Sequence, residues 1–257
     1  MSGTKSTFSK EEQINAVENA ADKYYYTAEQ EFDDIYKKMV IDETQNFIKP
    51  GKILELGYIN RIWTDTLLKK ATTVDIIEAA SSHVARAEED FAEELGKKVF
   101  VHKTLFEDYQ PREPYDTILM AGVIKHVPDD LGFLRLVRTW LKPDGVIIGC
   151  TPNSRSFHRR LGTYMGLELA PDRFNKRDIE VFNRHLYDRF QWRALFLEAG
   201  YEVIHLQGVF LKILSTQQMM HLGEKYDIDK IMEGLRQLGR ELEDYAWYLI
   251  LVAHLPA

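Results

Sequence analysis

Residues Lys52-Ile-Leu-Glu-Leu-Gly57 decide the fold of this 257-residue chain. The run is short, apolar and ended by glycine, which predicts a buried parallel strand followed by a tight turn. A second run, Val74-Asp-Ile-Ile-Glu78, ends in an acid. That acid follows Gly57 by about twenty residues, the spacing at which a carboxylate meets ribose hydroxyls in doubly wound folds. Together the two runs predict a site for an adenosine-containing ligand.

Short apolar runs alternate with amphipathic segments along the rest of the chain. Further strands are expected at residues 99–102, 117–121, 145–150, 201–206 and 245–253. Because amphipathic helices separate most of these runs, the pattern predicts an α/β fold with a parallel sheet covered on both faces. Residues 1–50 are expected to form an N-terminal helical lid and residues 51–152 the ligand-binding core. Residues 153–195 are expected to form a cap insertion, and residues 196–257 to complete the sheet around a helical insertion.

Composition narrows the class of protein. The net charge is -7 and 45% of the residues are hydrophobic. An acidic chain of this kind argues against nucleic-acid binding, which needs a concentrated basic face. The sequence has no apolar run long enough to span a membrane, no secretory signal and no zinc-type cluster, so we expect no membrane partner, no metal and a cytoplasmic location. The single cysteine, Cys150, is expected to be a buried structural thiol.

An ordered set of motifs gives the chain a family resemblance. Beyond Ile53-Leu-Glu-Leu-Gly57 and Glu78 come Tyr115-Asp-Thr-Ile-Leu-Met120, Gly122-Val-Ile-Lys-His-Val127, Leu141-Lys-Pro-Asp-Gly145 and Thr151-Pro-Asn153. In this order they resemble class I S-adenosylmethionine-dependent methyltransferases of the small-molecule type, over roughly residues 45 to 257. The resemblance implies a Rossmann-like sheet of seven strands, mostly parallel with an antiparallel last strand, with N-terminal helices and a helical cap. It also implies S-adenosylmethionine as the cofactor.

The chain departs from the family in its glycine-rich turn. Where the family has Gly-x-Gly-x-Gly, this sequence has Gly57-Tyr-Ile-Asn-Arg61, so Ile59 and Arg61 replace two glycines. Glycines let the backbone approach a ligand closely. S-adenosylmethionine has a carboxylate in place of a pyrophosphate, which makes a weaker demand on the turn. Arg61 is a candidate partner for that carboxylate, and the alternative is a solvated Arg61 with Ile59 packed inward.

Ligands of open parallel sheets bind at the carboxyl ends of the strands, and this rule selects the cofactor residues. Glu55 is assigned to the methionine part, Glu78 to the ribose, and the apolar residues Leu105 and Phe106 to the adenine. A tyrosine near residue 25 is a candidate lid over the cofactor. The full set of candidate cofactor-binding residues is Tyr25, Glu55, Gly57, Tyr58, Ile59, Arg61, Glu78, Ala79, Leu105, Phe106, Ala121 and Gly122.

Two histidines are the catalytic candidates. His126 follows the fourth expected strand, where the resemblance places the transferable methyl, and an imidazole can take a proton near neutral pH. The equally weighted alternative is a histidine that caps the helix starting at Pro128-Asp129-Asp130. His185 lies in Asn183-Arg-His-Leu-Tyr187, which resembles a cap motif of small-molecule methyltransferases in which Asn183 occupies the usual histidine position.

The cap is the basic part of an acidic chain. Residues 153–193 carry nine Lys or Arg against five Asp or Glu. Such a patch suits an acceptor with a carboxylate or phosphate, and a solvated basic face is the competing explanation. The candidate acceptor-binding residues are Asn153, Arg155, His158, Asn183 and Tyr187. A Met-rich stripe within residues 216–243 is expected to be core or the face of a homodimer.

These features predict methyl transfer to the oxygen or nitrogen of a small polar metabolite, such as an amino-acid derivative, a sugar or a natural-product intermediate. The altered glycine turn keeps a second hypothesis open, in which the fold serves as a binding partner or uses the bound cofactor in a reaction other than methylation. A Rossmann-type dehydrogenase is a weaker third hypothesis, because the pyrophosphate turn that it needs is missing.

Overall fold

The computed structural model describes residues 9–21 and 28–256, and the fold is built around one sheet. Its strands are β1 (Gly51–Leu56), β2 (Ala71–Glu78), β3 (Val99–Lys103), β4 (Tyr115–Ala121), β5 (Leu141–Pro152), β6 (Glu202–Val209) and β7 (Tyr248–His254). Their order across the sheet is β3-β2-β1-β4-β5-β7-β6. The first five strands are parallel, and β7 is antiparallel to both β5 and β6. The predicted fold class is therefore confirmed.

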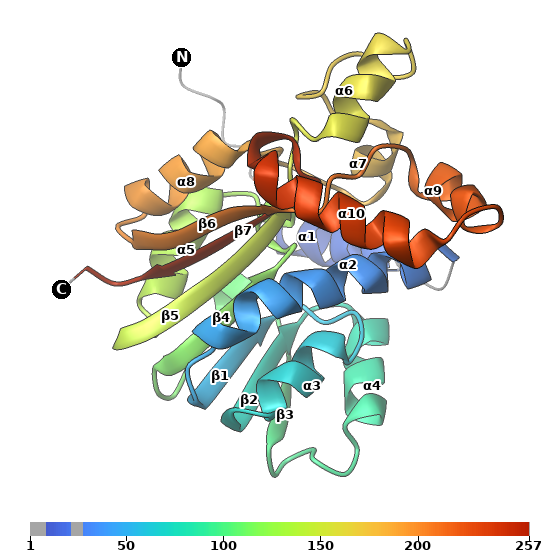
Figure 1. Cartoon of the computed structure of the whole chain (residues 1–257). Helices are drawn as coiled ribbons and strands as arrows, with labels where there is room; N and C mark the ends of the chain where they lie inside the picture. Colours follow the sequence, from blue (N-terminus) through green and yellow to red (C-terminus); the bar gives the residue numbers. More distant parts are fainter. Residues whose placement is uncertain (1–8, 22–27, 257) are drawn as a thin grey trace.

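Helices cover both faces of this sheet (Figure 1). The helices are α1 (Lys10–Ala21), α2 (Ala28–Thr44), α3 (Ile62–Leu68), α4 (Ser81–Asp90), α5 (Asp130–Arg138), α6 (Phe157–Tyr164), α7 (Lys176–Glu180), α8 (Arg189–Glu198), α9 (Thr216–Gly223) and α10 (Ile228–Glu241). Four short 3₁₀ segments complete the described elements: η2 (Gln45–Phe47), η3 (Phe106–Asp108), η4 (Ile124–His126) and η5 (Glu243–Tyr245). No helix of the described residues is long and apolar enough to cross a membrane.

Two apolar clusters form the core, one on each face of the sheet. On one face, Tyr36 of α2, Leu67 of α3 and Met232 of α10 pack against strand residues such as Ile53. On the other, α5 and α8 contribute a second cluster, which includes Phe133, Trp192 and Phe196. The strands are buried on both sides because their runs are almost wholly apolar. This explains why the short runs of the sequence could be recognised as central strands.

The Met-rich stripe belongs to the core. Met219 of α9 and Met232 and Leu235 of α10 are all buried and lie in the same cluster as Tyr36. The helical insertion expected around residues 216–243 consists of two helices, α9 and α10. Asp227 begins the second of them, because its side chain accepts a hydrogen bond from the Lys230 N–H.

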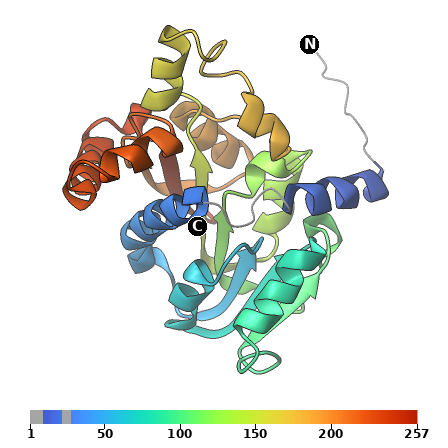
Figure 2. The same ribbon diagram turned by 90° about the vertical axis from the view of Figure 1, so that its right-hand side faces the viewer.

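The cap and the N-terminal helices lie at the carboxyl edge of the sheet. Helices α6 and α7 follow β5 and stand above the sheet at the top of Figure 1. Figure 2 shows α1 lying beside α4, on the side of the molecule away from α9 and α10. The carboxyl ends of β1 to β5 are thus enclosed by segments that come before and after them in the chain.

Candidate active site

A cavity of about 730 Å³ lies at the carboxyl ends of the parallel strands. The strand order reverses between β1 and β4, and open α/β sheets bind ligands outside such a switch point. The loops after β1, β2, β3 and β4 line one part of the cavity, while α1, α2 and the cap line the rest. The volume lies within the usual range for small-molecule sites.

The turn after β1 keeps the one glycine that its geometry requires. Gly57 has φ +77°, and a Cβ there would lie 3.0 Å from Cγ2 of Val123. Tyr58 follows and turns its ring away, so that its hydroxyl donates to Asp90 at 2.5 Å. Tyr58 is almost fully buried and is among the residues that line the cavity. Ile59 is half-buried and lines the cavity.

Glu78, at the end of β2, is hydrogen-bonded to the turn that follows β1. Its Oε2 accepts from the Tyr58 N–H at 2.9 Å, and its Oε1 accepts from the Ala79 and Ala80 N–H groups at 2.7 Å each. His83 lies 3.7 Å from Oε2. A carboxylate offers about four lone-pair sites, of which these N–H groups use three, and Glu78 lines the cavity. Glu78 therefore shapes the site, and its contact with a ribose stays a prediction.

Glu55 is a second buried acid at the end of β1. Its side chain is 3% exposed, and Oε2 accepts from the Thr64 hydroxyl at 2.7 Å. Burial raises the pKa of Glu55 to about 8, although the Thr64 hydrogen bond opposes the shift. The carboxyl group is thus mostly protonated at neutral pH. A cation bound beside it would favour the charged form.

The loops after β3 and β4 provide the apolar and open parts of the site. Leu105 and Phe106 line the cavity, and Phe106 packs against Phe133 with ring centroids 5.4 Å apart. Ala121 and Gly122 line it at the end of β4. Gly122 has φ +71°, and no atom lies within 4 Å of the position that a Cβ would take. This opening would let a ligand approach the backbone.

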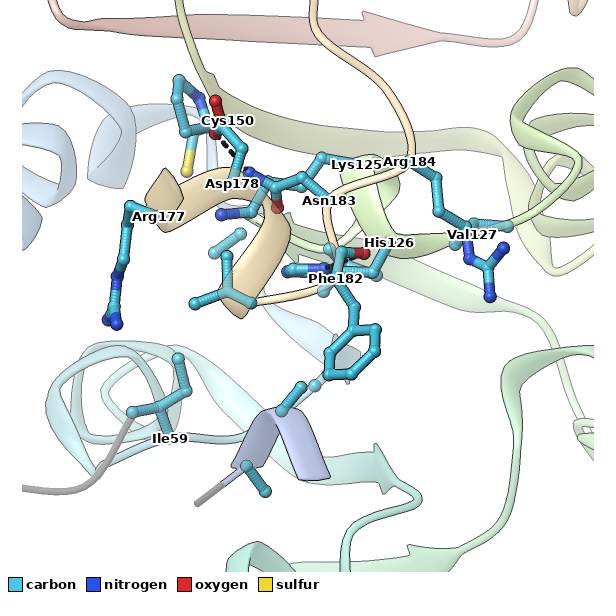
Figure 3. Close-up of a pocket in the computed structure, with 18 of the residues that line it drawn as sticks. Ile59, Lys125, His126, Val127, Cys150, Arg177, Asp178, Phe182, Asn183 and Arg184 are labelled. Atoms are coloured by element: carbon cyan, nitrogen blue, oxygen red, sulfur yellow. Dashed lines mark hydrogen bonds between the residues drawn. The ribbon is translucent and has the colours of Figure 1, made fainter. Parts of the chain in front are cut away.

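His126 lies in η4 and faces the cap (Figure 3). Its Nδ1 is 3.5 Å from the carbonyl oxygen of Phe182, a residue with φ +55°. Positive φ is uncommon for a bulky residue and often marks a functional segment. Burial and the charge of Lys125 lower the pKa of His126 to about 3. The capping alternative is wrong, because Asp129 caps α5 by accepting from the Gly132 N–H.

Several residues predicted for the site are held elsewhere. Arg61 does not line the cavity. Its guanidinium forms an ion pair with Asp65 on the exposed side of α3, with the Nε–Oδ2 distance 2.9 Å. Arg155 is exposed and lies 3.9 Å from Asp188. Tyr25 lies outside the described residues.

His185 and Tyr187 connect the cap to the start of α5 by hydrogen bonds. Nε2 of His185 donates to the Val127 carbonyl at 2.8 Å, and its Nδ1 lies 3.6 Å from Asp130. The Tyr187 hydroxyl donates to the same carboxylate at 2.8 Å. Neither residue lines the cavity. The structure does not bring His185 together with His126 as a catalytic pair, because its hydrogen bonds turn it toward α5.

Asn153, His158 and Asn183 do line the cavity. The Asn153 amide is used structurally, since Nδ2 donates to the carbonyls of Asp244 and Ala246. Asn183 donates to Asp178 at 2.7 Å, and its buried Oδ1 has no partner among the described residues. The buried Nδ1 of His158 likewise has none within the described ranges. Burial and the charge of Lys212 lower the His158 pKa, so the ring is neutral.

Some cavity residues had no signal in the sequence. Lys37 of α2 and Lys212 after β6 line the cavity although each is about 95% buried, and Lys212 lies 3.8 Å from the ring centre of Trp247. His83 and Phe182 also line the cavity and were not predicted. Helical spacing predicts which side of a helix is apolar, but it does not identify a lysine that points into a cavity. Cys150 also lines the cavity, and burial raises its pKa to about 12.

A cavity at the switch point of a doubly wound sheet, with an acid at the end of β2, is the place where such folds bind nucleotide-type ligands. A family model described as a methyltransferase domain matches residues 26–206. The chain belongs to this family. Membership confirms the predicted methyltransferase family and enzyme class.

Relatives of known name align with this chain over only part of their own length. A ubiquinone biosynthesis O-methyltransferase of Actinobacillus pleuropneumoniae serotype 5b (strain L20) is 28% identical over 131 residues, 49% of this chain and 53% of that protein. The protein of the same name from Paramagnetospirillum magneticum is 33% identical over 101 residues, covering 39% of this chain and 40% of its own length. The chain thus matches about half of these relatives or less.

Solved structures share the fold at low sequence identity. The DhpI-SAM-HEP complex has a TM-score of 0.60 at 16% identity and covers 96% of this chain and 100% of that one. N-methyltransferase NodS from Bradyrhizobium japonicum WM9, in complex with S-adenosylhomocysteine, gives 0.58 at 11%, covering 95% and 100%. The [4+2]-cyclase SpnF gives 0.60 at 17%, covering 95% and 94%.

Proposed function

We propose that this protein transfers a methyl group from S-adenosylmethionine to an oxygen or nitrogen of a small polar metabolite in a cytoplasmic biosynthetic step. The observation that carries the proposal is one continuous cavity with two distinct parts. One part is lined by Glu78, Leu105 and Gly122 at the strand ends, and the other by His126 and the cap. Methyl transfer needs this arrangement, because donor and acceptor must meet in line and away from water.

The residues at the strand ends fit the cofactor. Glu78 lines the cavity and keeps an acceptor position for a ribose hydroxyl, and Leu105 and Phe106 offer an apolar surface for an adenine. The open space at Gly122 allows a ligand to lie against β4. When bound, the cofactor supplies an electrophilic methyl group, and the protein's part is to orient the acceptor, exclude water and handle its proton.

The acceptor side supports a small anionic substrate. Lys125, Arg177 and Arg184 line this part of the cavity (Figure 3). The buried Lys212 lines the cavity as well. Guanidinium and ammonium groups favour carboxylates and phosphates. His126 is neutral at physiological pH and is a weak base, since its pKa is about 3. We therefore assign it to orienting the acceptor by a hydrogen bond, which suits an amine or an already acidic hydroxyl.

The first test is calorimetric titration with S-adenosylmethionine. We expect binding at micromolar concentration for the native chain and weaker binding for Glu78→Ala by about 1–3 kcal/mol, because charge-assisted hydrogen bonds are lost. Glu88→Ala is the control, since Glu88 is an exposed acid of α4 that does not line the cavity. No binding at millimolar ligand, or equal binding by native protein and Glu78→Ala, would contradict the proposal.

One observation favours an alternative reaction on the same site. The structurally similar SpnF is described as a [4+2]-cyclase, so this fold also occurs in an enzyme whose name is not that of a methyltransferase. The weakly basic His126 is compatible with a reaction that removes no proton. Incubation with methyl-labelled S-adenosylmethionine and a panel of small carboxylates, phosphates, phenols and amines separates the two. Transfer of label to an acceptor supports methylation, whereas tight cofactor binding with no transfer across the panel favours the alternative.

A further inference from the structure

Buried residues of the cap hold Asn183 in one orientation. Its Nδ2 donates to Oδ1 of Asp178 at 2.7 Å, and its backbone N–H donates to the Asp178 carbonyl at 2.8 Å. Asp178 is 7% exposed, and its Oδ2 forms an ion pair with the equally buried Arg159 at 2.9 Å. Because a carboxylate only accepts hydrogen bonds, the amide nitrogen of Asn183 has to face Asp178 and the amide oxygen has to face away from it.

The amide oxygen of Asn183 is left without a hydrogen bond. Oδ1 is buried and has no partner within residues 9–21 and 28–256, although Asn183 lines the cavity. A buried acceptor without a donor lowers stability, and such an atom in a native structure calls for an explanation. An N–H or O–H group of a bound molecule would supply the missing hydrogen bond.

The oxygen lies on the acceptor side of the cavity, beside η4. Both chain neighbours of Asn183 contact this segment: the Phe182 carbonyl lies 3.5 Å from Nδ1 of His126, and the Arg184 N–H donates to the Lys125 carbonyl at 2.7 Å. Figure 3 shows Asn183 next to Lys125 and His126. The loop that carries Asn183 is thus fixed to the segment that follows β4 before any ligand binds, which lowers the entropy lost on binding.

The charges around His126 favour a neutral amine as the group bound there. After burial, which is the main cause, Lys125 and Arg184 also lower the pKa of His126. A like charge disfavours the protonated form of any basic group in the same place, so these cations would keep an amine neutral and nucleophilic. A hydroxyl also has to lose its proton during transfer, and His126, with a pKa of about 3, takes up a proton poorly.

We propose that Asn183 selects an amine as the methyl acceptor, with Oδ1 accepting a hydrogen bond from the nitrogen to be methylated. This inference rests on the proposed function and names its acceptor class. The nitrogen lone pair forms the bond to the methyl carbon while the carbon–sulfur bond breaks and leaves its electron pair on sulfur. The nitrogen becomes positively charged, so its hydrogen bond to Oδ1 strengthens in the transition state. The proton then leaves the nitrogen to water.

The test measures transfer from methyl-labelled S-adenosylmethionine to matched probes, each pair an amine and its hydroxyl counterpart with the same anionic group. The pairs are anthranilate with salicylate, glycine with glycolate, and phosphoethanolamine with ethylene glycol phosphate. We expect the native chain to label an amine and not its counterpart. Asn183→Ala should lower kcat for that amine about 10- to 100-fold. Asn183→His should gain transfer to the hydroxyl counterpart, because an imidazole takes up the proton that an amide does not.

Calorimetry with S-adenosylhomocysteine checks the fold of the variants, and equal affinity in the native chain and both Asn183 variants is expected. The control Asn46→Ala changes an exposed asparagine of η2 that does not line the cavity, and it should keep the native kcat.

The outcomes separate this inference from the function on which it rests. Faster labelling of the hydroxyl compounds, or a native kcat in Asn183→Ala, overturns the assignment of Asn183 while the proposed function stands. Loss of S-adenosylhomocysteine binding in Asn183→Ala overturns it as well, because Asn183 would then support the fold instead of the acceptor. If the native chain labels none of the probes, the proposed function is overturned and this inference with it.

Discussion

The acids at the ends of β1 and β2 differ in what holds them. Glu78 accepts three backbone hydrogen bonds, whereas Glu55 has one hydroxyl partner and a pKa raised to about 8 by burial. Burial with a single hydrogen-bond partner favours the neutral form of Glu55. Two carboxyl groups on adjacent strands can therefore serve different ends of one ligand, an acceptor at the β2 end and a mostly neutral group at the β1 end.

A second single residue, His126, gives a prediction about how the free energy of unfolding depends on pH. Its pKa falls from 6.5 to about 3 on folding, with burial as the main cause. Below the unfolded value, the unfolded chain takes up a proton that the folded chain does not. The His126 contribution to the free energy of unfolding therefore decreases as the pH falls toward about 3. His126→Gln removes this contribution, so the variant should lose less stability than the native chain between about pH 7.5 and about pH 5.

Urea unfolding at the two pH values measures this difference. The stability of each protein at the higher pH is its own reference. At that pH His126 is neutral in both the folded and the unfolded chain, so the native protein and the variant differ only in packing. An equal loss of stability in native and variant chains would show that the imidazole titrates normally, and His126 would again be a candidate proton acceptor near neutral pH.

The sequence predicted the strand-end residues well and the cap residues less well. Glu55, Gly57 and Gly122 follow from a local rule, since the carboxyl ends of parallel strands share one edge of the sheet. His185 depends on how a loop turns after α7, which is decided by its contacts with Val127 and Asp130. Those contacts are far apart in sequence, and a motif of five residues does not contain them.

At the scale of elements, α1 is latched to α4 by one acid. Glu18 accepts from the Ser81 N–H at 3.0 Å and from its hydroxyl at 2.5 Å, so it caps α4 from another helix. Lys103 donates to the same hydroxyl at 2.7 Å. Ala16, Val17 and Ala20 of α1 line the cavity beside this latch. Helix α1 thus covers the cavity close to Ala79 and Glu78.

Breaking the latch should loosen the cover over the cavity. We expect Glu18→Ala to raise the dissociation rate of S-adenosylhomocysteine and to increase amide hydrogen exchange in α1, with little change in the sheet. Glu11→Ala is the matched control, an exposed acid of the same helix. Burial opposes ionisation of Glu18, but the Ser81 hydrogen bonds outweigh it and lower the pKa. The latch is therefore strongest above the unfolded pKa and weakens as the pH falls. Equal exchange in both variants would show that other contacts hold α1.

At the scale of the whole molecule, the position of β7 joins β5 and β6 in one sheet. This last strand inserts between β5 and β6, so residues 248–254 pair with one strand that precedes the cap and one that follows it. The apolar pattern predicted each strand, and the antiparallel direction of the last one came with the family resemblance, since periodicity carries no pairing information. Arg236 and Arg240 of α10 also bind Glu43 of α2, which joins the C-terminal helices to the N-terminal ones.

This connectivity predicts one cooperative unfolding transition for the core. The segments 51–152 and 196–257 share one sheet and one pair of apolar clusters, so neither buries its strands without the other. We expect coincident transitions by far-ultraviolet circular dichroism and tryptophan fluorescence, because Trp63 and Trp192 lie on opposite faces. S-adenosylhomocysteine at about 100 times its Kd should stabilise the folded state by about 2.7 kcal/mol and shift both probes together. Separate transitions, or a ligand shift in only one probe, would show that the two segments fold as independent units.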